Sequence, residues 1–376
     1  MIYLDYNATT PIDPAVAEAM MPYILEHYGN PSSSHALGRT AKQAVETARA
    51  QAASLLHAMP DEVIFTSGGS ESNNMVIKGV AWKYRAKGNH IITSTIEHPS
   101  VLNVCGYLGQ NGYRITYLPV DHYGRVSPAD LESAITDQTL LVSVMHANNE
   151  TGTIQPIQEL AAISHRHGAF FHTDAAQSAG KIPIDVQQLG VDFLTVAGHK
   201  LYAPKGIGAL YIRHGVEMDP YIHGAGHERG LRAGTENVIH DVALGQACTI
   251  AQAKLPVTGI RDLTHYFWGR LQSVFGSAVV LNGHPTERLP NTLNVSFIGW
   301  RGYEILDQLS EVAASTGSAC HAGETSLSPV LKAMGIPENV GLGAIRFSLG
   351  RWTTSGELDE VIQQLVKIIE AKSRPS

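Results

Sequence analysis

The sequence predicts an α/β fold, with a large domain built on a mostly parallel seven-stranded sheet flanked by helices, and with a smaller α+β domain after it. Three observations predict this architecture. Between about residues 60 and 213, short runs rich in β-branched residues alternate with helical stretches. Most of these runs end in small or polar residues. After Thr235 the alternation gives way to long helical patterns with two further strand-like runs.

The runs of the first part are too short for helices and are typical of strands. They are Val63–Ser67, His90–Thr95, Tyr113–Leu118, Leu140–His146, Ala169–Asp174, Phe193–Ala197 and Ile207–Ile212. Because helical stretches connect them, we expect a mostly parallel sheet with helices on both faces. Two helices begin with a capping residue and a proline at the first helical position, at Asp13-Pro14 and at Ser127-Pro128.

The second part has helical patterns, a strand at Asn291–Phe297, a loop that holds Cys320, a strand at Ala344–Leu349 and a terminal helix. This order is typical of an α+β domain. We assign residues 13–255 to the large domain. Residues 1–12 and 256–376 form the predicted small domain, which carries the Cys320 loop.

The composition is that of a glycine-rich globular protein, because 44% of the 376 residues are hydrophobic and 16% are charged. The formal net charge is −7 and no stretch concentrates Lys and Arg, so nucleic acid is not expected as a partner. No segment approaches about 18 consecutive apolar residues, and the first residues lack a signal-peptide pattern. We therefore expect a cytoplasmic protein with no membrane partner.

No metal site is predicted. The three cysteines are too few and too far apart for a disulfide framework or a CxxC metal site, so we expect reduced thiols. The 18 histidines form no HExxH motif, and their close pairs lack a third ligand at a recognised spacing.

In open α/β sheets, ligands bind beyond the carboxyl ends of the strands, so the polar residues that follow each run are candidates for a site. The first run is followed by Gly68, Gly69 and Ser70 and then by a helix, a turn that aims backbone N–H groups and a hydroxyl at an anion. Alone, such a turn is more often an ordinary capped helix. Further polar residues after the later runs are expected at the same edge, namely His98, Asn149, Asp174, Gln177, His199 and Lys200.

A lysine at the mouth of a sheet, desolvated by its neighbours, can have a lowered pKa and act as an amine nucleophile. Lys200 has that position, with a carboxylate at Asp174 and an anion-binding turn at Gly69 and Ser70. Pyridoxal phosphate needs such a set: a lysine for covalent attachment, an acid for the pyridinium nitrogen and donors for the phosphate. The constellation therefore predicts a pyridoxal phosphate site.

At this point the sequence resembles the cysteine desulfurases of the class V aminotransferase group along nearly its whole length. The matching segments occur in the same order. They are Tyr3–Pro11, Tyr28–Ser32, Thr66–Ser72, Asn148–Glu150, Asp174–Gln177, Gly198–Lys200, Gly226–Arg229, Gly234–Thr235, Gly317–Cys320 and Arg346–Arg351.

The resemblance implies a pyridoxal-phosphate enzyme of fold type I. It implies that Lys200 bonds to the cofactor and later moves the substrate Cα proton, and that Asp174 pairs with the ring nitrogen. It also implies that Gln177 and Asn149 contact the edge of the cofactor ring that carries the ring oxygen. His98 is implied to stack over the ring and to shuttle protons to the substrate thiol.

The resemblance also implies that Gly69, Ser70 and His199 hold the phosphate and that a second subunit supplies Thr235, so a homodimer is expected. Ala197 departs from the pattern, because many members have a serine there whose hydroxyl helps to bind the phosphate. We expect the loss of this donor to weaken cofactor affinity by about 1 kcal/mol.

Arg346, together with Asn30, is implied as the clamp for the substrate carboxylate. Cys320 lies among small polar residues and is implied as the nucleophile that takes sulfur from L-cysteine as a persulfide, leaving L-alanine. The sulfur then passes to an acceptor protein, by resemblance an iron-sulfur cluster scaffold or a thiolation pathway. Cys105 and Cys248 lie in apolar helical patterns and are expected to be buried.

Two other activities remain as alternatives. Selenocysteine lyases also have a histidine directly after the reactive cysteine, as His321 follows Cys320, and a run similar to Ser328–Leu331. The spacing between Cys320 and that run matches the desulfurases better. In a plain aminotransferase, the other alternative, Cys320 would be incidental. A protein without catalysis is disfavoured, because the residues that carry the chemistry are all present.

Overall fold

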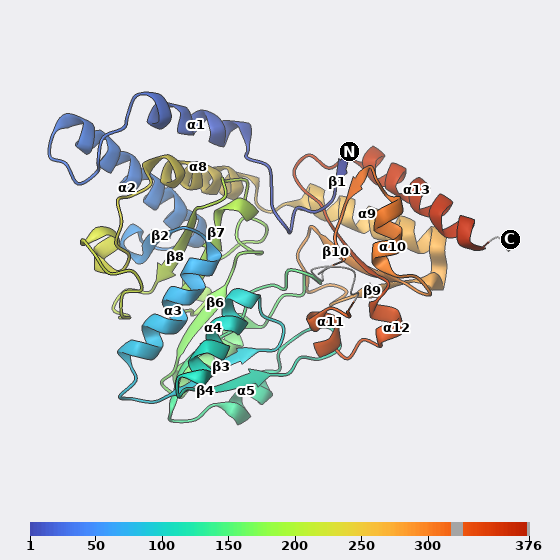
Figure 1. The fold of residues 1–376 in the computed structure, drawn as a ribbon, viewed down its shortest axis with the longest axis horizontal. Coiled ribbons are helices and arrows are strands. Elements are labelled where there is room, and N and C mark those ends of the chain that lie inside the picture. The colour runs from blue at the N-terminus through green and yellow to red at the C-terminus, as the bar shows by residue number, and fades with distance from the viewer. Residues whose placement is uncertain (317–325, 374–376) are drawn as a thin grey trace.

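The computed structural model describes residues 1–316 and 326–373 of the chain. Its largest feature is a seven-stranded sheet with the order β2-β8-β7-β6-β5-β3-β4 (Figure 1). The strands are β2 (Val63–Thr66), β3 (His90–Ser94), β4 (Arg114–Leu118), β5 (Thr139–Ser143), β6 (Phe170–Asp174), β7 (Phe193–Ala197) and β8 (Gly208–Ile212). Every run predicted in this part of the chain coincides with one of these strands, so the predicted sheet is confirmed.

The sheet is mostly parallel, as expected. Strand β8 runs antiparallel to both of its neighbours, and the other pairs are parallel. The order of the strands reverses between β3 and β5, because the chain goes from β3 to β4 on one side and then passes to β5, β6 and β7 on the other. Such a reversal leaves a crevice outside the carboxyl ends of the two strands, where α/β proteins bind ligands.

Helices cover both faces of this sheet. They are α1 (Pro14–Leu25), α2 (Ala36–Leu56), α3 (Gly69–Lys83), α4 (Pro99–Gln110), α5 (Pro128–Ala134), α6 (Ile157–Arg166), α7 (Val186–Leu189) and α8 (Val238–Lys254), with short 3-10 helices η1 (Pro60–Glu62), η2 (Gly198–Lys200) and η3 (His227–Gly230). The side chains of Asp13 and Ser127 cap α1 and α5, and proline occupies the first position of each helix, as predicted.

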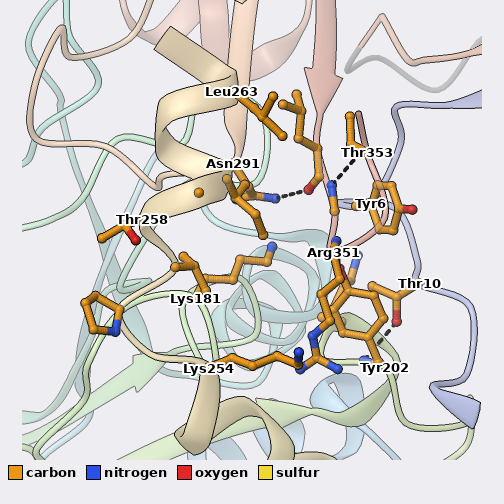
Figure 2. A pocket seen from close by; sticks show the side chains of 18 residues that line it. Tyr6, Thr10, Lys181, Tyr202, Lys254, Thr258, Leu263, Asn291, Arg351 and Thr353 are labelled. Atoms are coloured by element: carbon orange, nitrogen blue, oxygen red, sulfur yellow. Dashed lines mark hydrogen bonds between the residues drawn. The ribbon is translucent and has the colours of Figure 1, made fainter. Parts of the chain in front are cut away.

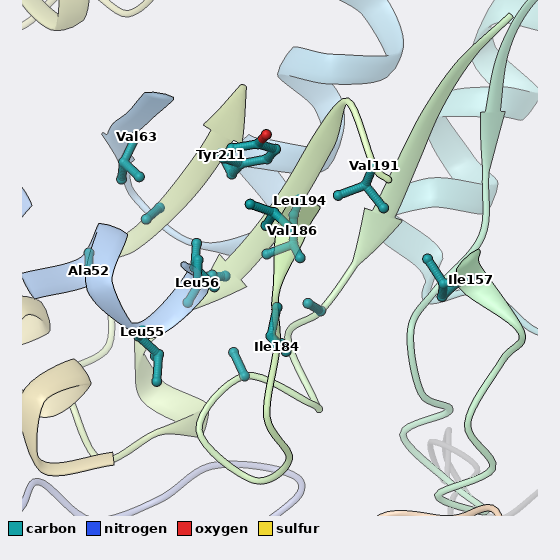
Figure 3. Close-up of a cluster of buried hydrophobic side chains, with 14 of the residues drawn as sticks. Ala52, Leu55, Leu56, Val63, Ile157, Ile184, Val186, Val191, Leu194 and Tyr211 are labelled. Atoms are coloured by element: carbon teal, nitrogen blue, oxygen red, sulfur yellow. The ribbon is translucent and has the colours of Figure 1, made fainter. Parts of the chain in front are cut away.

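Neighbouring residues of the strands point to opposite faces, and apolar side chains cover both. On one face, α3 and α4 form a cluster with Ile64 and Leu210. On the other face, Val63, Leu194 and Tyr211 belong to a cluster with α2, α6 and α8 (Figure 3). Because both faces are buried, the carboxyl edge is the part of the sheet left for a site.

The C-terminal part contains a three-stranded antiparallel sheet with the order β12-β10-β9. Its elements are α9 (Thr258–Phe275), η4 (Gly276–Ala278), β9 (Val279–Asn282), β10 (Thr292–Phe297), α10 (Gly302–Gln308), α11 (Pro329–Ala333), α12 (Glu338–Gly341), β12 (Ala344–Ser348) and α13 (Ser355–Ser373). The two strands predicted here are confirmed. Strand β9 was missed, because its apolar run is very short and closely follows the long helical pattern of α9, and periodicity cannot separate so short a run from a helix.

The first residues of the chain belong to this C-terminal part. Strand β1 (Ile2–Tyr3) pairs in parallel with β11 (Val312–Ala313), and Ile2 and Leu4 lie in the hydrophobic cluster of the small sheet (Figure 1). The assignment of residues 1–12 to a small domain and the domain boundary at residue 255 both stay predictions.

The C-terminal part contacts the large sheet at the carboxyl ends of strands β3 and β5. Val330 and Leu331 of α11 lie in one buried cluster with Ile96 and Met145, which follow β3 and β5. The C-terminal part of the chain therefore packs against the carboxyl edge of the large sheet. Among the described residues, no helix has both the length and the apolar character needed to cross a membrane.

Candidate active site

A cavity of about 360 Å³ lies at the carboxyl edge of the large sheet, where the strand order reverses. Most of the predicted site residues line it. They are Gly69, Ser70, His98, Asn149, Asp174, Gln177, His199, Lys200 and Arg346. All but Arg346 follow or end strands of the large sheet, and Arg346 comes from β12 of the small one.

Glycine holds the turn between β2 and α3. Gly68 is the N-cap of α3 and has a φ of 142°, which residues with a side chain rarely adopt. A Cβ added at Gly208 would come within 2.7 Å of the Gly68 Cα atom, so β8 approaches this turn closely. The turn therefore places the first N–H groups of α3 and the Ser70 side chain at the cavity, where they can bind an anion.

Lys200 ends η2, directly after β7, and is half-buried. Its Nζ donates hydrogen bonds to the backbone oxygens of Asn7 and Ala8, the latter at 2.8 Å. Desolvation and the nearby Arg346 lower the pKa of Lys200 to about 8, and the carboxylates of Asp5 and Asp174 act in the opposite direction. A part of the amine is therefore uncharged near neutral pH, as a nucleophilic lysine requires.

Asp174 is the last residue of β6 and is buried. Its Oδ1 accepts a hydrogen bond from the Ala176 backbone N–H at 2.9 Å, and its Oδ2 accepts one from Asn73 Nδ2 at 2.7 Å. Both carboxylate oxygens therefore accept a hydrogen bond from a neighbouring residue. Asp174 thus presents a buried negative charge that can stabilise a protonated ring nitrogen.

Two imidazoles line the cavity. Nδ1 of His98 accepts a hydrogen bond from the Ser100 backbone N–H at 3.2 Å and lies 2.8 Å from Ser100 Oγ. Desolvation, aided by Lys200 and opposed by Asp174, lowers the pKa of His98. Desolvation and Lys200 also lower the pKa of His199, to about 4. Both rings are therefore neutral at neutral pH.

Arg346 reaches the cavity from β12. Its Nη1 donates to the backbone oxygen of Asn149 at 2.9 Å, and its Nη2 forms an ion pair with Asp5 Oδ1 at 2.7 Å. Its Nε is buried and has no hydrogen-bond partner within the described part of the chain. A buried guanidinium donor left without a partner favours binding of an acceptor such as a carboxylate.

Three predicted residues are not placed in this cavity. Asn30 is exposed, and its Oδ1 accepts a hydrogen bond from the Ser32 backbone N–H at 2.8 Å. Thr235 is exposed and does not line the cavity of its own chain. Cys320 lies outside the described residues. The other cysteines, Cys105 and Cys248, are buried as predicted, and burial raises the pKa of each thiol to about 12.

Sequence reasoning missed several residues that hold the site together. Asp5 and Asn7 stand in a matched segment, but their partners lie in distant parts of the chain. Asn7 Nδ2 donates to Thr292 Oγ1 at 2.8 Å, and its Oδ1 accepts from Lys181 Nζ at 3.0 Å. Asn73 lies one helical turn after Ser70, and this spacing is a signal that could have been used.

A second and larger cavity, of about 410 Å³, is lined by Tyr6 and Thr10 among other residues (Figure 2). Lys200 reaches both cavities. Lysine, arginine and apolar side chains line the larger one, and none of its described lining residues is Asp, Glu, His or Cys. Because it lacks a carboxylate or imidazole for proton transfer, we place the candidate active site in the smaller cavity.

Comparison with known proteins identifies the family of this chain. The family model described as "Aminotransferase class-V" matches residues 2–361. The chain belongs to the class-V aminotransferase family. It is 47% identical over 372 residues to the cysteine desulfurase IscS of Methanosarcina thermophila, a match that covers 98% of this chain and 92% of that protein.

Solved structures of this family have the same fold. A structure described as a NifS-like protein superposes with a TM-score of 0.92 at 37% identity, and the match covers 98% of this chain and 99% of the other. The structure described as "SspA in complex with cysteine" has a TM-score of 0.83 at 39% identity and covers 94% and 100% of the two chains. The mostly parallel seven-stranded sheet is therefore the fold of class-V aminotransferases.

Proposed function

We propose that this chain is a pyridoxal-phosphate-dependent cysteine desulfurase. It converts L-cysteine and the Cys320 thiol into L-alanine and a Cys320 persulfide. The Cβ–S bond of the substrate breaks, an S–S bond to Cys320 forms, the attacking thiol loses a proton and Cβ gains one. The reaction therefore needs no external oxidant or reductant. The observation that carries the proposal is the cavity in which Lys200, Asp174 and the α3 N-terminus meet.

The residues of the cavity fit pyridoxal phosphate in their chemistry. Asp174 would pair with the ring nitrogen, Lys200 would bond to the aldehyde carbon, and Gly69, Ser70 and His199 would bind the phosphate. Gln177 and Asn149 would lie at the oxygen edge of the ring. When bound, this cofactor supplies an electron sink for the charge that develops at the substrate Cα.

Lys200 is the residue that moves the Cα proton. Its pKa of about 8 lets the amine both accept and return a proton near neutral pH. Its hydrogen bonds to the oxygens of Asn7 and Ala8 restrict the side chain before the cofactor binds. Once these hydrogen bonds break, the Lys200 amine is available in the smaller cavity.

Arg346 and His98 bind the substrate. The free Nε of Arg346 is the donor for the substrate carboxylate. The positive charge of Arg346, which pairs with Asp5 in this structure, also attracts that carboxylate. Asn30 is proposed to assist Arg346. His98 lines the same cavity and would contact the cofactor ring and the sulfur end of the substrate.

The remaining parts of the site come from the assembly and from the Cys320 loop. We assign Thr235 to the phosphate site of a second subunit, so the active enzyme is a homodimer. Residues 13–255 form the cofactor-binding domain, and residues 1–12 with 256–376 carry the reactive cysteine. The persulfide sulfur then goes to an acceptor protein such as an iron-sulfur scaffold.

The intact mass of the cofactor-loaded protein tests this function. We expect borohydride reduction to attach the cofactor to wild-type protein and not to Lys200→Ala. Treatment with L-cysteine should add the mass of one sulfur atom, which dithiothreitol removes. Cys320→Ser should show no added sulfur, whereas Cys105→Ser, which changes a buried thiol, should retain it.

Other results would contradict the proposal. A cofactor adduct without added sulfur, together with pyridoxamine formation, would indicate an aminotransferase. Much faster turnover of L-selenocysteine than of L-cysteine would indicate a selenocysteine lyase. The absence of any adduct would exclude the cofactor.

A further inference from the structure

A chain of hydrogen bonds links Asp174 and His98, two residues that line the cavity. Asn73, a buried residue of α3, is the first link between them. Asn73 Nδ2 donates to Asp174 Oδ2 at 2.7 Å and to Ser100 Oγ at 2.8 Å. Because a carboxylate only accepts hydrogen bonds, the group of Asn73 that faces Asp174 must be its NH₂, and both of its hydrogens are used.

The orientation of this amide leaves its oxygen without a partner. Asn73 Oδ1 is buried and makes no hydrogen bond with the described part of the chain. A buried amide oxygen without a donor costs free energy, so the contacts of the NH₂ group must hold the side chain in place. The charged carboxylate of Asp174 supplies the stronger of these contacts.

Ser100 passes this arrangement on to His98. Its hydroxyl oxygen accepts from Asn73, which favours donation of the hydroxyl hydrogen to His98 Nδ1, 2.8 Å away. The Ser100 backbone N–H donates to the same nitrogen at 3.2 Å. A ring nitrogen that receives two donors must present its lone pair, so the proton of the neutral ring is on Nε2.

We propose that Asn73 and Ser100 are positioning residues that hold His98 as a neutral imidazole with its proton on Nε2. His98 then donates a hydrogen bond from Nε2 to the substrate sulfur and keeps its proton throughout the reaction. This inference rests on the proposed function. It narrows the role that the resemblance implies, because His98 would orient the sulfur rather than shuttle protons.

The electrostatics of the cavity support a neutral ring. A proton on Nδ1 would face the two donors of Ser100, so the imidazolium form is disfavoured. Desolvation and Lys200 also lower the pKa of His98, and Asp174, which acts against them, is already bonded to Asn73 and Ala176. With His98 kept neutral, the Cα and Cβ protons are moved by Lys200.

The test uses the cofactor-loaded protein labelled with ¹⁵N-histidine, in which His98→Gln identifies the signals of His98. In wild-type protein we expect an unprotonated Nδ1 and a protonated Nε2, with no titration at the usual pKa of about 6.5. In Ser100→Ala and in Asn73→Leu, the pKa of His98 should rise by about 0.5 to 1 unit. Ser100→Ala removes a hydrogen-bond donor to the neutral ring, and Asn73→Leu leaves the Ser100 hydroxyl free to turn away from the ring.

Kinetic measurements accompany the spectra. Both variants should lower kcat for L-cysteine about tenfold, the size expected for one misdirected hydrogen bond, and Ser100→Thr, which keeps the hydroxyl, should restore most of the rate. Asn74→Leu is the matched control, because Asn74 is the neighbouring asparagine and its amide donates to the Ser70 backbone oxygen, not to Asp174 or Ser100. It should leave the His98 spectrum unchanged.

Two results would overturn the inference. One is a wild-type spectrum with the proton on Nδ1. The other is a wild-type kcat that rises as pH falls through the His98 pKa seen in the spectra, which would show that the imidazolium is the active form. Failure of the proposed function appears elsewhere, as the absence of sulfur transfer in the mass measurement, so the two failures are distinguishable.

Discussion

Lys200, Arg346 and Asp174 line one small cavity, and both Arg346 and Asp174 affect the pKa of Lys200. Desolvation is the largest cause of the lowered Lys200 pKa, and Arg346 adds to it. Asp5 and Asp174 partly oppose these effects. The balance leaves Lys200 able to react near neutral pH, which a lysine in water, with its pKa of about 10.4, cannot do efficiently.

This balance predicts how the cofactor-free protein reacts with pyridoxal phosphate. The free amine is the nucleophile, so the rate should rise with pH, with a midpoint near pH 8, and level off about one pH unit higher. In Arg346→Met, a repelling charge is lost and Asp5 is freed, so the midpoint should move upward by about one unit. Stopped-flow absorbance across pH 6.5 to 9.5 measures both midpoints.

The control for this experiment is Arg270→Met, which removes an exposed arginine from α9, where Arg270 pairs with Asp359. It should keep the wild-type midpoint. A rate in the wild-type protein that keeps rising beyond pH 9.5 would contradict the lowered pKa of Lys200. An unchanged midpoint in Arg346→Met would show that Arg346 does not affect this amine.

The helices that carry site residues begin at polar side chains or at glycine. Gly68 precedes α3, and His98 caps α4 while it lines the cavity. Asp13 caps α1 with Oδ1 on the Ala15 backbone N–H at 3.1 Å, and its Oδ2 forms an ion pair with Arg351 at 2.8 Å. One carboxylate thus starts a helix and also contacts the C-terminal part of the chain.

Two capping residues can be compared directly. Ser127→Ala should lower the free energy of unfolding by about 1 kcal/mol or less, because its cap on α5 is a single contact of 3.4 Å. Asp13→Ala should lower it by about 3 kcal/mol, because it also leaves Arg351 without its partner in a largely buried place. Urea unfolding of the cofactor-loaded protein measures both changes.

A double-mutant cycle separates the two effects of Asp13. If the ion pair carries most of the loss, Asp13→Ala should cost little in an Arg351→Met background, where only the cap is removed. Equal losses for Asp13→Ala and Ser127→Ala in the wild-type background would contradict this account of the interface.

At the scale of the whole molecule, the site is made by segments that are far apart in the chain. Residues 5–8 run between the two cavities, where Asn7 and Ala8 accept hydrogen bonds from Lys200. Asp5 pairs with Arg346 of the small sheet. Thr235, in contrast, is exposed and outside the cavity of its own chain, as a residue that serves a second subunit would be.

The proposed dimer predicts that two inactive variants restore each other. Lys200→Ala lacks the nucleophile, and Thr235→Asp should repel the phosphate, so each homodimer should lose more than about 100-fold in activity. In a mixed dimer, one site receives both changes and the other receives neither. Mixing after mild dissociation and reassociation should therefore restore one active site per heterodimer, read as L-alanine formed.

Subunit exchange is checked with differently tagged chains. A mixed dimer that forms but stays inactive would contradict the assignment of Thr235 to the partner's site. A Thr235→Asp protein that keeps full activity by itself would exclude Thr235 from the phosphate site altogether.

The sequence by itself determined the large sheet and most of the site. Each strand is a short apolar run bounded by turn residues, and the parallel arrangement then brings the residues after the runs to one edge. For this reason Lys200, Asp174 and His98 were found together without a structure. The edge strand β9 was missed because its apolar run is very short and closely follows the long helix α9, so periodicity does not separate the two.

Only the tertiary structure decided which groups neutralise, orient or restrain these residues. Asp5 meets Arg346, and Asn73 meets Asp174 and Ser100, across long stretches of chain. Periodicity and capping patterns report local conformation, whereas these contacts depend on how sheets and helices pack. The charge of Lys200 and the tautomer of His98 follow from that packing, because desolvation and hydrogen bonds determine them. Neither the desolvation nor the hydrogen bonds can be predicted from the residues adjacent in the sequence.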